Sequence, residues 1–248
     1  MTSLPPDRVE LNRPRDLNAL LSESLALYRR HFWTFLAIGA AVVVPVYAIV
    51  FGVGLGQFKG GYDAGIPSAA APVPILVQVL VVDPLVAVMV LHALRETAAR
   101  GNPNVGRSIQ AGLDVFAAVF WPVLIALVCE IGTLITVIVP LVLVVRWYFV
   151  PQLVLAEGRR GTEALSASWE LTRGFGWRTA GLIVVGRLLY ALAGGLLATP
   201  LGIVAKAVDS QALSLAATVF GEMLVAAPVG IYGALMYFDL RARQSAVA

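Results

Sequence analysis

Long apolar runs separated by short polar segments dominate the chain. Each of six runs is close to the roughly 20 residues that an α-helix needs to cross the hydrocarbon core of a bilayer. They lie at 32–56, 73–95, 113–131, 134–156, 178–200 and 211–238. Between the third and fourth runs we place the break at Glu130-Ile131-Gly132-Thr133 rather than at Pro140, because this leaves two spans of adequate length. The pattern predicts an all-α, polytopic membrane protein with six transmembrane helices.

Composition supports a membrane protein and argues against a nucleic-acid partner. Apolar residues make up 59% of the chain and charged residues 13%, whereas an average soluble domain is about 45–50% apolar and roughly 25% charged. The net charge of +3 comes from basic residues scattered singly or in pairs between apolar runs. We therefore expect membrane lipids as partners. Another membrane protein or a second copy of the chain stays an alternative.

The basic residues of the loops gather on one predicted side of the membrane. Those on this side are Arg8, Arg13, Arg15, Arg29, Arg30, Arg95, Arg100, Arg107, Arg159, Arg160, Arg173, Arg178, Arg241 and Arg243. The opposite loops hold Lys59 and Lys206. By the positive-inside rule, both termini are cytoplasmic and the protein lies in the cell membrane. We predict a disordered cytosolic tail at 1–16, a single transmembrane domain at 17–243 and a short cytosolic tail at 244–248.

A threefold internal repeat becomes visible when three tryptophans are aligned. A small residue stands nine positions before each of Trp33, Trp121 and Trp177, and an apolar span follows each of them. The repeating unit is a short interfacial helix followed by a helical hairpin. The interfacial helices are expected at about 17–31, 104–117 and 162–175. Each tryptophan should lie at headgroup level, where an amphipathic ring is favoured.

One stretch resembles a known family. The run Arg146-Trp147-Tyr148-Phe149-Val150-Pro151-Gln152-Leu153-Val154-Leu155-Ala156-Glu157-Gly158, followed by Ser168-Trp169-Glu170-Leu171-Thr172-Arg173-Gly174, is similar to the signature of the glycerophosphoryl diester phosphodiesterase membrane-domain family. The matching motif residues are Arg146, Pro151, Glu157, Ser168 and Trp169. Ala167 replaces the basic residue that usually precedes the serine. The resemblance implies a membrane region without the catalytic domain that gives the family its name.

The sequence predicts no catalytic, cofactor or metal site. His31 and His92 are the only histidines and lack the spacing of a metal motif. Cys129 is the single cysteine. The glycine-rich run around Lys59 has no Ser or Thr after the lysine, so it does not fit a phosphate-binding loop. We therefore expect a protein that is not an enzyme.

Four charged residues fall near the middle of predicted spans: Asp83, Arg146, Arg187 and Glu222. A charge at that depth costs about 2.5–3.5 kcal/mol on insertion scales, so each needs a partner. Two are acidic and two basic, so they can neutralise one another, and we expect Arg187 and Glu222 to be partners or members of one network in the bundle interior. The network either locks the helices together or lines a polar cavity. The kink expected at Pro84 slightly favours a cavity.

These patterns leave three functions open. The first is a non-enzymatic scaffold or accessory subunit concerned with membrane lipids or envelope assembly. The second is a transporter or channel that uses the mid-membrane charges, and the third is a membrane-embedded lipid-modifying enzyme. A transporter needs a polar path that joins those charges to water. An enzyme needs a nucleophile, a base or a metal set in a cleft, whereas a scaffold needs neither.

Overall fold

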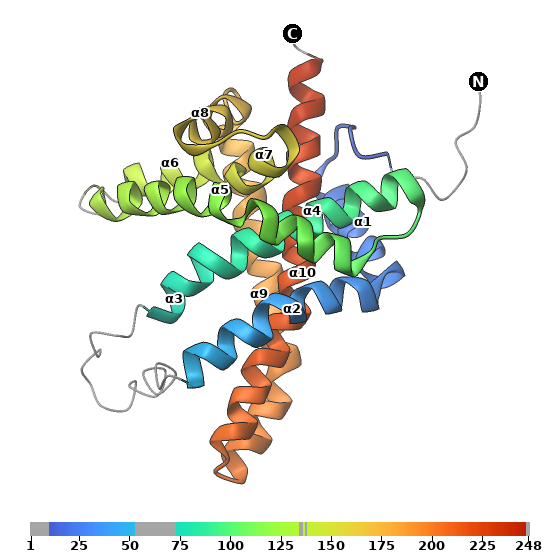
Figure 1. Cartoon of the computed structure of the whole chain (residues 1–248), viewed down its shortest axis with the longest axis vertical. Helices are drawn as coiled ribbons and strands as arrows, with labels where there is room; N and C mark the ends of the chain where they lie inside the picture. Colours follow the sequence, from blue (N-terminus) through green and yellow to red (C-terminus); the bar gives the residue numbers. More distant parts are fainter. Residues whose placement is uncertain (1–9, 53–72, 134–135, 137, 247–248) are drawn as a thin grey trace.

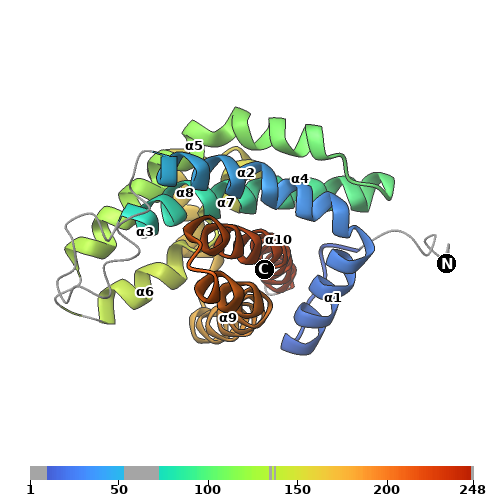
Figure 2. The same cartoon turned by 90° about the horizontal axis from the view of Figure 1, so that it is seen from below.

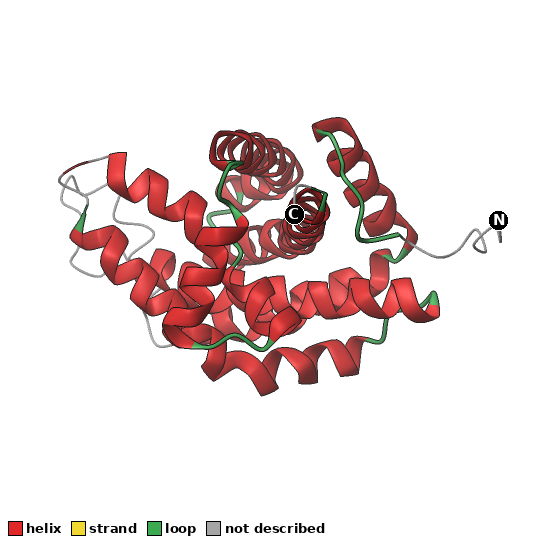
Figure 3. Ribbon diagram, turned by 90° about the horizontal axis from the view of Figure 1, so that it is seen from above, coloured by secondary structure: helices red, strands yellow, loops and turns green. Residues whose placement is uncertain are grey.

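Helices account for all the regular secondary structure in the described part of the chain. The computed structural model describes residues 10–52, 73–133, 136 and 138–246. Within those residues it holds helices and connecting loops and no strand (Figure 3). The elements are α1 (Leu17–Arg30), α2 (Phe32–Gly52), α3 (Val73–Val77), the π-helix η2 (Gln78–Val82), α4 (Asp83–Arg100), α5 (Val105–Gly132), α6 (Ile138–Trp147), α7 (Val150–Glu157), α8 (Gly161–Leu171), α9 (Gly176–Ala207) and α10 (Gln211–Ser245).

Six helical segments of the described chain are long and apolar enough to cross a bilayer. They are Phe32–Val50, Ile75–Arg100, Val105–Gly132, Ile138–Glu157, Gly176–Ala207 and Ala212–Ser245. Each corresponds to one predicted apolar run, and the break between the third and fourth follows Gly132 as expected. The prediction of an all-α, six-span fold is confirmed. The protein is an integral membrane protein.

The helices cross at steep angles. In Figure 1, α9 and α10 run along the long axis, whereas α2, α4 and α5 lie across them. Figure 2 shows α9 and α10 nearly end-on and the other three helices lengthwise. In Figure 1 the α9–α10 turn lies at the bottom, the last turn of α2 at the lower left and that of α5 at the left, whereas α1 and the α4–α5 turn lie at the right and the end of α10 lies at the top. The spans therefore alternate in direction along the chain.

Helix α10 is the centre of the molecule and packs against α1, α2, α4 and α9. Small residues allow these close approaches. A Cβ on Gly39 of α2 would lie 3.1 Å from the carbonyl oxygen of Met223, and one on Gly230 of α10 would lie 3.1 Å from a methyl carbon of Val90. Glycine lets helix backbones approach in this way in membrane proteins. The crossing points are thus set by residues without side chains.

The three predicted repeat units differ in their first helices. Helices α1 and α8 are separate short helices that precede the spans of α2 and α9, as the repeat predicts. In the second unit, the expected interfacial segment 104–117 and the following span form the single helix α5. Trp33, Trp121 and Trp177 all point away from the protein interior, with 78%, 61% and 94% of their surfaces exposed. Their depth in the membrane stays a prediction.

The predicted disordered tail is wrong for residues 10–16. Arg15 is 2% exposed, its backbone N–H donates to Asp239 Oδ1 at 2.6 Å, and its Nε donates to Glu23 Oε2 at 2.9 Å. Arg178 and Arg243 both donate to the Arg15 carbonyl and both pair with Asp239. We call these five residues the N-terminal clasp. Residues 1–9 of the predicted tail lie outside the described residues.

The short tail predicted at 244–248 is also partly helical. Helix α10 continues to Ser245. The Gln244 amide donates to the carbonyl oxygens of Glu170 and Leu171 in α8, at 2.8 and 3.0 Å. These bonds satisfy carbonyls at the end of α8 that have no partner within that helix. Residues 247–248 lie outside the described residues.

Candidate functional site

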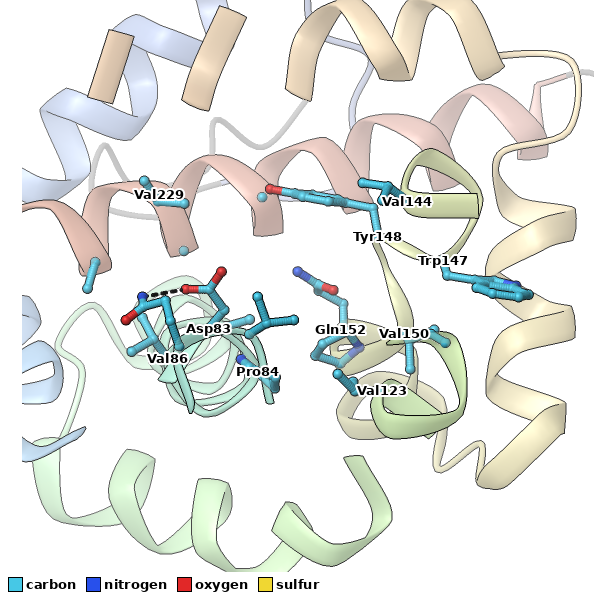
Figure 4. Close-up of a pocket in the computed structure, with 18 of the residues that line it drawn as sticks. Asp83, Pro84, Val86, Val123, Val144, Trp147, Tyr148, Val150, Gln152 and Val229 are labelled. Atoms are coloured by element: carbon cyan, nitrogen blue, oxygen red, sulfur yellow. Dashed lines mark hydrogen bonds between the residues drawn. The ribbon is translucent and has the colours of Figure 1, made fainter. Parts of the chain in front are cut away.

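A cavity of about 320 Å³ lies among η2, α4, α5, α6, α7, α9 and α10. Much of its wall consists of valine and alanine side chains, as expected inside a membrane protein. Its polar lining residues are Gln78, Asp83, Glu130, Tyr148, Gln152, Arg187 and Glu222. Figure 4 shows Asp83, Tyr148 and Gln152 around the same open space. The site therefore combines apolar walls with a few converging polar groups, the usual composition of a ligand pocket.

A π-helical turn places Asp83 in the cavity wall. The backbone N–H of Asp83 bonds to the carbonyl of Gln78, five residues earlier. The next residue, Pro84, has no N–H and cannot continue an α-helical ladder, which accounts for the change of register here. The Gln78 side-chain amide donates to Asp83 Oδ1 at 2.8 Å (dashed in Figure 4). π-turns inside membrane helices and elsewhere occur frequently at functional sites.

Charges in the cavity wall are held by partners from other helices. Arg187 of α9 forms an ion pair with Asp83 of α4, with 3.0 Å between guanidinium nitrogen and carboxylate oxygen. The Tyr148 hydroxyl lies beside the same guanidinium. Glu222 of α10 interacts with Tyr47 of α2. Three of the four charges predicted at mid-span thus meet at one cavity.

The predicted network of four charges needs one correction. Arg187 pairs with the carboxylate of Asp83, and Glu222 lines the same cavity. The steep crossing of α9 over α4 brings the guanidinium to the start of α4. Arg146 lies away from the cavity, where it donates to Thr172 Oγ1 at 3.3 Å and stacks on Trp169 with 5.0 Å to the ring centroid.

Two buried amide oxygens in this site have no partner. Gln152 is 3% exposed, and its Oε1 receives no hydrogen bond within the part of the chain that the structure describes. The same is true of Gln78 Oε1. In Figure 4 the Gln152 side chain points into the cavity toward Asp83. Buried amide oxygens normally have hydrogen-bond partners, so these two unpaired oxygens are exceptional.

A glycine in α10 makes room for these side chains. A Cβ on Gly233 would lie 3.3 Å from the Tyr148 hydroxyl and 3.6 Å from Gln152 Nε2. Sequence reasoning missed Gln78, Tyr148 and Gln152, and it set Glu130 aside as a residue of the outer turn. The available signal was a carboxamide inside an apolar run, which occurs at both Gln78 and Gln152.

The motif residues of the family resemblance surround the break between α6 and α7. Ser168 of α8 donates to the carbonyl of Arg146 at 2.7 Å and accepts from the backbone N–H of Phe149 at 3.3 Å. Pro151 stands in the first turn of α7. The remaining motif residue, Glu157, accepts from Tyr237 at 3.0 Å. These contacts fix the position of residues 148–152, which carry two of the polar side chains in the cavity wall, Tyr148 and Gln152. The cavity and the motif are thus physically connected.

No protein-family model, curated protein or solved structure matches the chain. Within the described residues, no three His, Cys, Asp or Glu side chains are grouped to hold a metal ion. The functional argument therefore depends on the cavity itself.

Proposed function

We propose that this protein is a non-enzymatic, multi-pass protein of the cell membrane that holds a small polar ligand in the cavity beside Asp83. The observation that carries the proposal is the buried carboxamide of Gln152, which points into the cavity and whose oxygen has no hydrogen-bond partner among the described residues. Leaving such a group unsatisfied costs about 1–3 kcal/mol. A ligand that pairs with the carboxamide would offset part of that cost, whereas a purely structural core would be better served by an apolar side chain.

The cavity favours a ligand-binding function, of the kind a transporter or ligand-dependent accessory subunit has, over a plain scaffold. A scaffold needs tight apolar contacts between spans and no polar interior. Here the Asp83–Arg187 pair borders an open space and keeps 30% and 50% of its side-chain surfaces exposed. The Ser168 hydroxyl of the family signature is engaged by backbone groups. This arrangement supports a role other than catalysis.

We also propose membership of the glycerophosphoryl diester phosphodiesterase membrane-domain family. The support is that its motif residues cluster in space, with Ser168 and Trp169 of α8 both contacting Arg146. Such clustering is expected of a signature that specifies a local structure. The proposal carries no phosphodiesterase activity to this chain.

Copurification tests the ligand-binding function. The protein should be extracted in native lipid, and its bound molecules quantified by mass spectrometry for the natural chain, Gln152→Leu and the control Gln110→Leu. Gln110 is exposed on α5. We expect one molecule to be enriched with the natural chain and the control, and depleted with Gln152→Leu. The same molecules in the same amounts in all three samples would exclude the cavity as a binding site and favour the scaffold.

We further propose that both termini are cytoplasmic. In a background that lacks Cys129, cysteine introduced at Lys206 should react with an impermeant thiol reagent added outside intact cells. Cysteine at Arg100 or Arg160 should be protected until the cells are opened. Labelling of the arginine positions alone would reverse the orientation. Lys59, which is predicted on the same side as Lys206, lies outside the described residues.

A further inference from the structure

Two hydrogen-bond donors face the cavity from the start of α7 and the break before it. In Figure 4 the amide nitrogen of Gln152 points into the open space, whereas its oxygen is buried. This amide nitrogen donates to no residue in the described part of the chain. The Tyr148 hydroxyl bonds to the Arg187 guanidinium, which can only donate. The Tyr148 oxygen therefore accepts this bond, and its own O–H is left to donate.

A glycine of α10 brings these two donors to one point. A Cβ on Gly233 would lie 3.3 Å from the Tyr148 hydroxyl oxygen and 3.6 Å from Gln152 Nε2. Gly233 lines the cavity, and because it has no side chain, the space at that point belongs to the cavity. We call this space the Gly233 notch. A ligand oxygen placed there can accept hydrogen bonds from both Tyr148 and Gln152.

Neither an anion nor an ammonium group suits the Gly233 notch. The Arg187 guanidinium is already paired with the Asp83 carboxylate, and Glu130 and Glu222 also line the cavity. A carboxylate or phosphate would add a fourth acidic group without a further positive charge to balance it. An ammonium group has no acceptor and would face the two donors of the notch. The ligand group must therefore accept hydrogen bonds and carry no charge.

A carbonyl oxygen meets these requirements better than a hydroxyl. It has two lone pairs, one for each donor of the Gly233 notch, and it has no hydrogen of its own. A hydroxyl can accept from the same donors. However, its hydrogen also needs an acceptor, because an unpaired polar group inside a membrane protein is costly.

The cavity is accessible from the lipid-facing surface. Val144 of α6 lines it and is 41% exposed, and Leu188 of α9, next to Arg187, is 57% exposed. Helices α6 and α9 contact each other and both belong to membrane spans. The cavity volume of about 320 Å³ equals that of about ten water molecules in the liquid. It can hold the polar part of a lipid-soluble molecule whose chain extends out between α6 and α9.

We infer that the Gly233 notch binds the uncharged carbonyl oxygen of a lipid-soluble molecule, with the Gln152 amide and the Tyr148 hydroxyl as hydrogen-bond donors. Arg187 holds the Tyr148 hydroxyl in the orientation that donates. The inference rests on the ligand-binding function proposed above. The carbonyl has two possible sources, an acyl ester of a membrane glycerolipid or a quinone dissolved in the bilayer. Both present the same kind of oxygen to the same donors.

Ligand-induced stabilisation tests the preference for a carbonyl. The thermal stability of the full chain in detergent should be measured at neutral pH with equal concentrations of cyclohexanone, cyclohexanol, cyclohexylamine and cyclohexanecarboxylate. These probes share a ring and differ in the polar group. Cyclohexanone should raise the melting temperature saturably, cyclohexanol less, and the two charged probes not at all. Stronger stabilisation by any of the other three probes would overturn the carbonyl inference and leave the binding function intact.

Variants connect the effect to the Gly233 notch. Gly233→Ala fills the notch with a methyl group and should abolish cyclohexanone binding, whereas the control Gly202→Ala, where an added Cβ meets nothing within 4 Å, should bind normally. Tyr148→Phe keeps the ring and removes one donor, so it should weaken binding about three- to tenfold even if Gly233→Ala loses its fold. Unchanged affinity in Tyr148→Phe, or in a folded Gly233→Ala, would place the ketone elsewhere and refute the inference.

Lipid nanodiscs distinguish the two sources. The full chain should be placed in nanodiscs of diester phosphatidylcholine or of its diether analogue, which lacks the carbonyl oxygens. Higher stability in the diester discs, lost in Gly233→Ala, identifies a lipid ester. Equal stability in both discs, with Gly233-dependent stabilisation by added decylubiquinone, identifies a quinone. If no carbonyl probe binds but another molecule copurifies in a Gln152-dependent manner, the carbonyl is refuted and the binding function is kept. No bound probe and no copurified ligand would refute both.

Discussion

Replacing Asp239 with asparagine should release the N-terminal segment from the body of the protein. The Asp239 side chain is fully buried. It accepts from the backbone of Arg15 at 2.6 Å, from Arg243 at 2.9 Å and from Arg178 at 3.1 Å. Asparagine keeps the shape of the side chain but removes the charge. Its amide group would also present a donor to groups that are themselves donors.

The size of the effect follows from these contacts. Removing one partner of a buried ion pair costs about 3–5 kcal/mol. The Arg178 and Arg243 side chains are 31% and 28% exposed, so water partly solvates them after the change. We therefore expect a loss near the lower limit, about 3 kcal/mol. Since each 1.4 kcal/mol is a factor of ten, the detached state of residues 10–16 should become about 100-fold more populated.

Trypsin cleavage measures this opening. Arg13 precedes a proline, so the Arg15–Asp16 bond is the cleavable site of the segment. Cleavage there follows the population of the open state when opening is fast. We expect cutting after Arg15 to be about 100-fold faster in Asp239→Asn, with cutting after exposed Arg100 unchanged as the internal reference. The exposed Asp209→Asn is the matched control. Equal rates at Arg15 in the natural chain and Asp239→Asn would refute the clasp.

Two further changes test packing and protonation. Gly186→Ala should lower the free energy of unfolding by about 1–3 kcal/mol, because the new methyl would overlap the buried Tyr232 ring. The control Gly181→Ala, on the open side of α9, should be neutral or stabilising. Equal melting temperatures for the two variants would contradict the contact. Burial and the charge of Arg30 lower the pKa of His31, so the unfolded chain binds the proton more readily and stability should fall as the pH drops below about 6.5. His31→Gln should flatten this part of a melting-temperature profile measured from pH 5 to 8, and an unchanged slope would exclude His31 as the cause.

The sequence was sufficient for the spans and insufficient for their arrangement. An apolar run indicates a segment that is buried away from water, and all six predicted runs correspond to helices long and apolar enough to cross a membrane. It does not report the angle at which two spans cross. That angle depends on where the backbones of two helices approach each other, as at Gly39 and Gly230. The sequence around a glycine in an apolar run does not indicate which helix it will contact. For this reason the sequence could place Arg187 and Glu222 at similar depth but could not predict that Arg187 pairs with Asp83.

The site was partly predictable for a related reason. Charges stand out in apolar runs, so Asp83, Arg187 and Glu222 could be selected before the structure. Gln78 and Gln152 are less conspicuous, because an uncharged amide is tolerated within a span at a lower cost than a charge. The contact of Arg15 with Asp239 was invisible, since it joins residues 224 positions apart and begins in a proline-rich segment without periodicity.

The cavity and the shape of the α6–α7 break have one physical origin. Pro151 cannot donate a backbone hydrogen bond, so α6 cannot continue smoothly into α7. Ser168 bonds two backbone groups at the break, the carbonyl of Arg146 and the N–H of Phe149. The chain then turns so that Tyr148 and Gln152 both face the cavity. In an uninterrupted helix Tyr148 and Gln152 would also share one face, because residues four apart do so. The break adds a turn between them that Ser168 holds in place. The Ser168 hydroxyl therefore holds in place the segment that carries Tyr148 and Gln152.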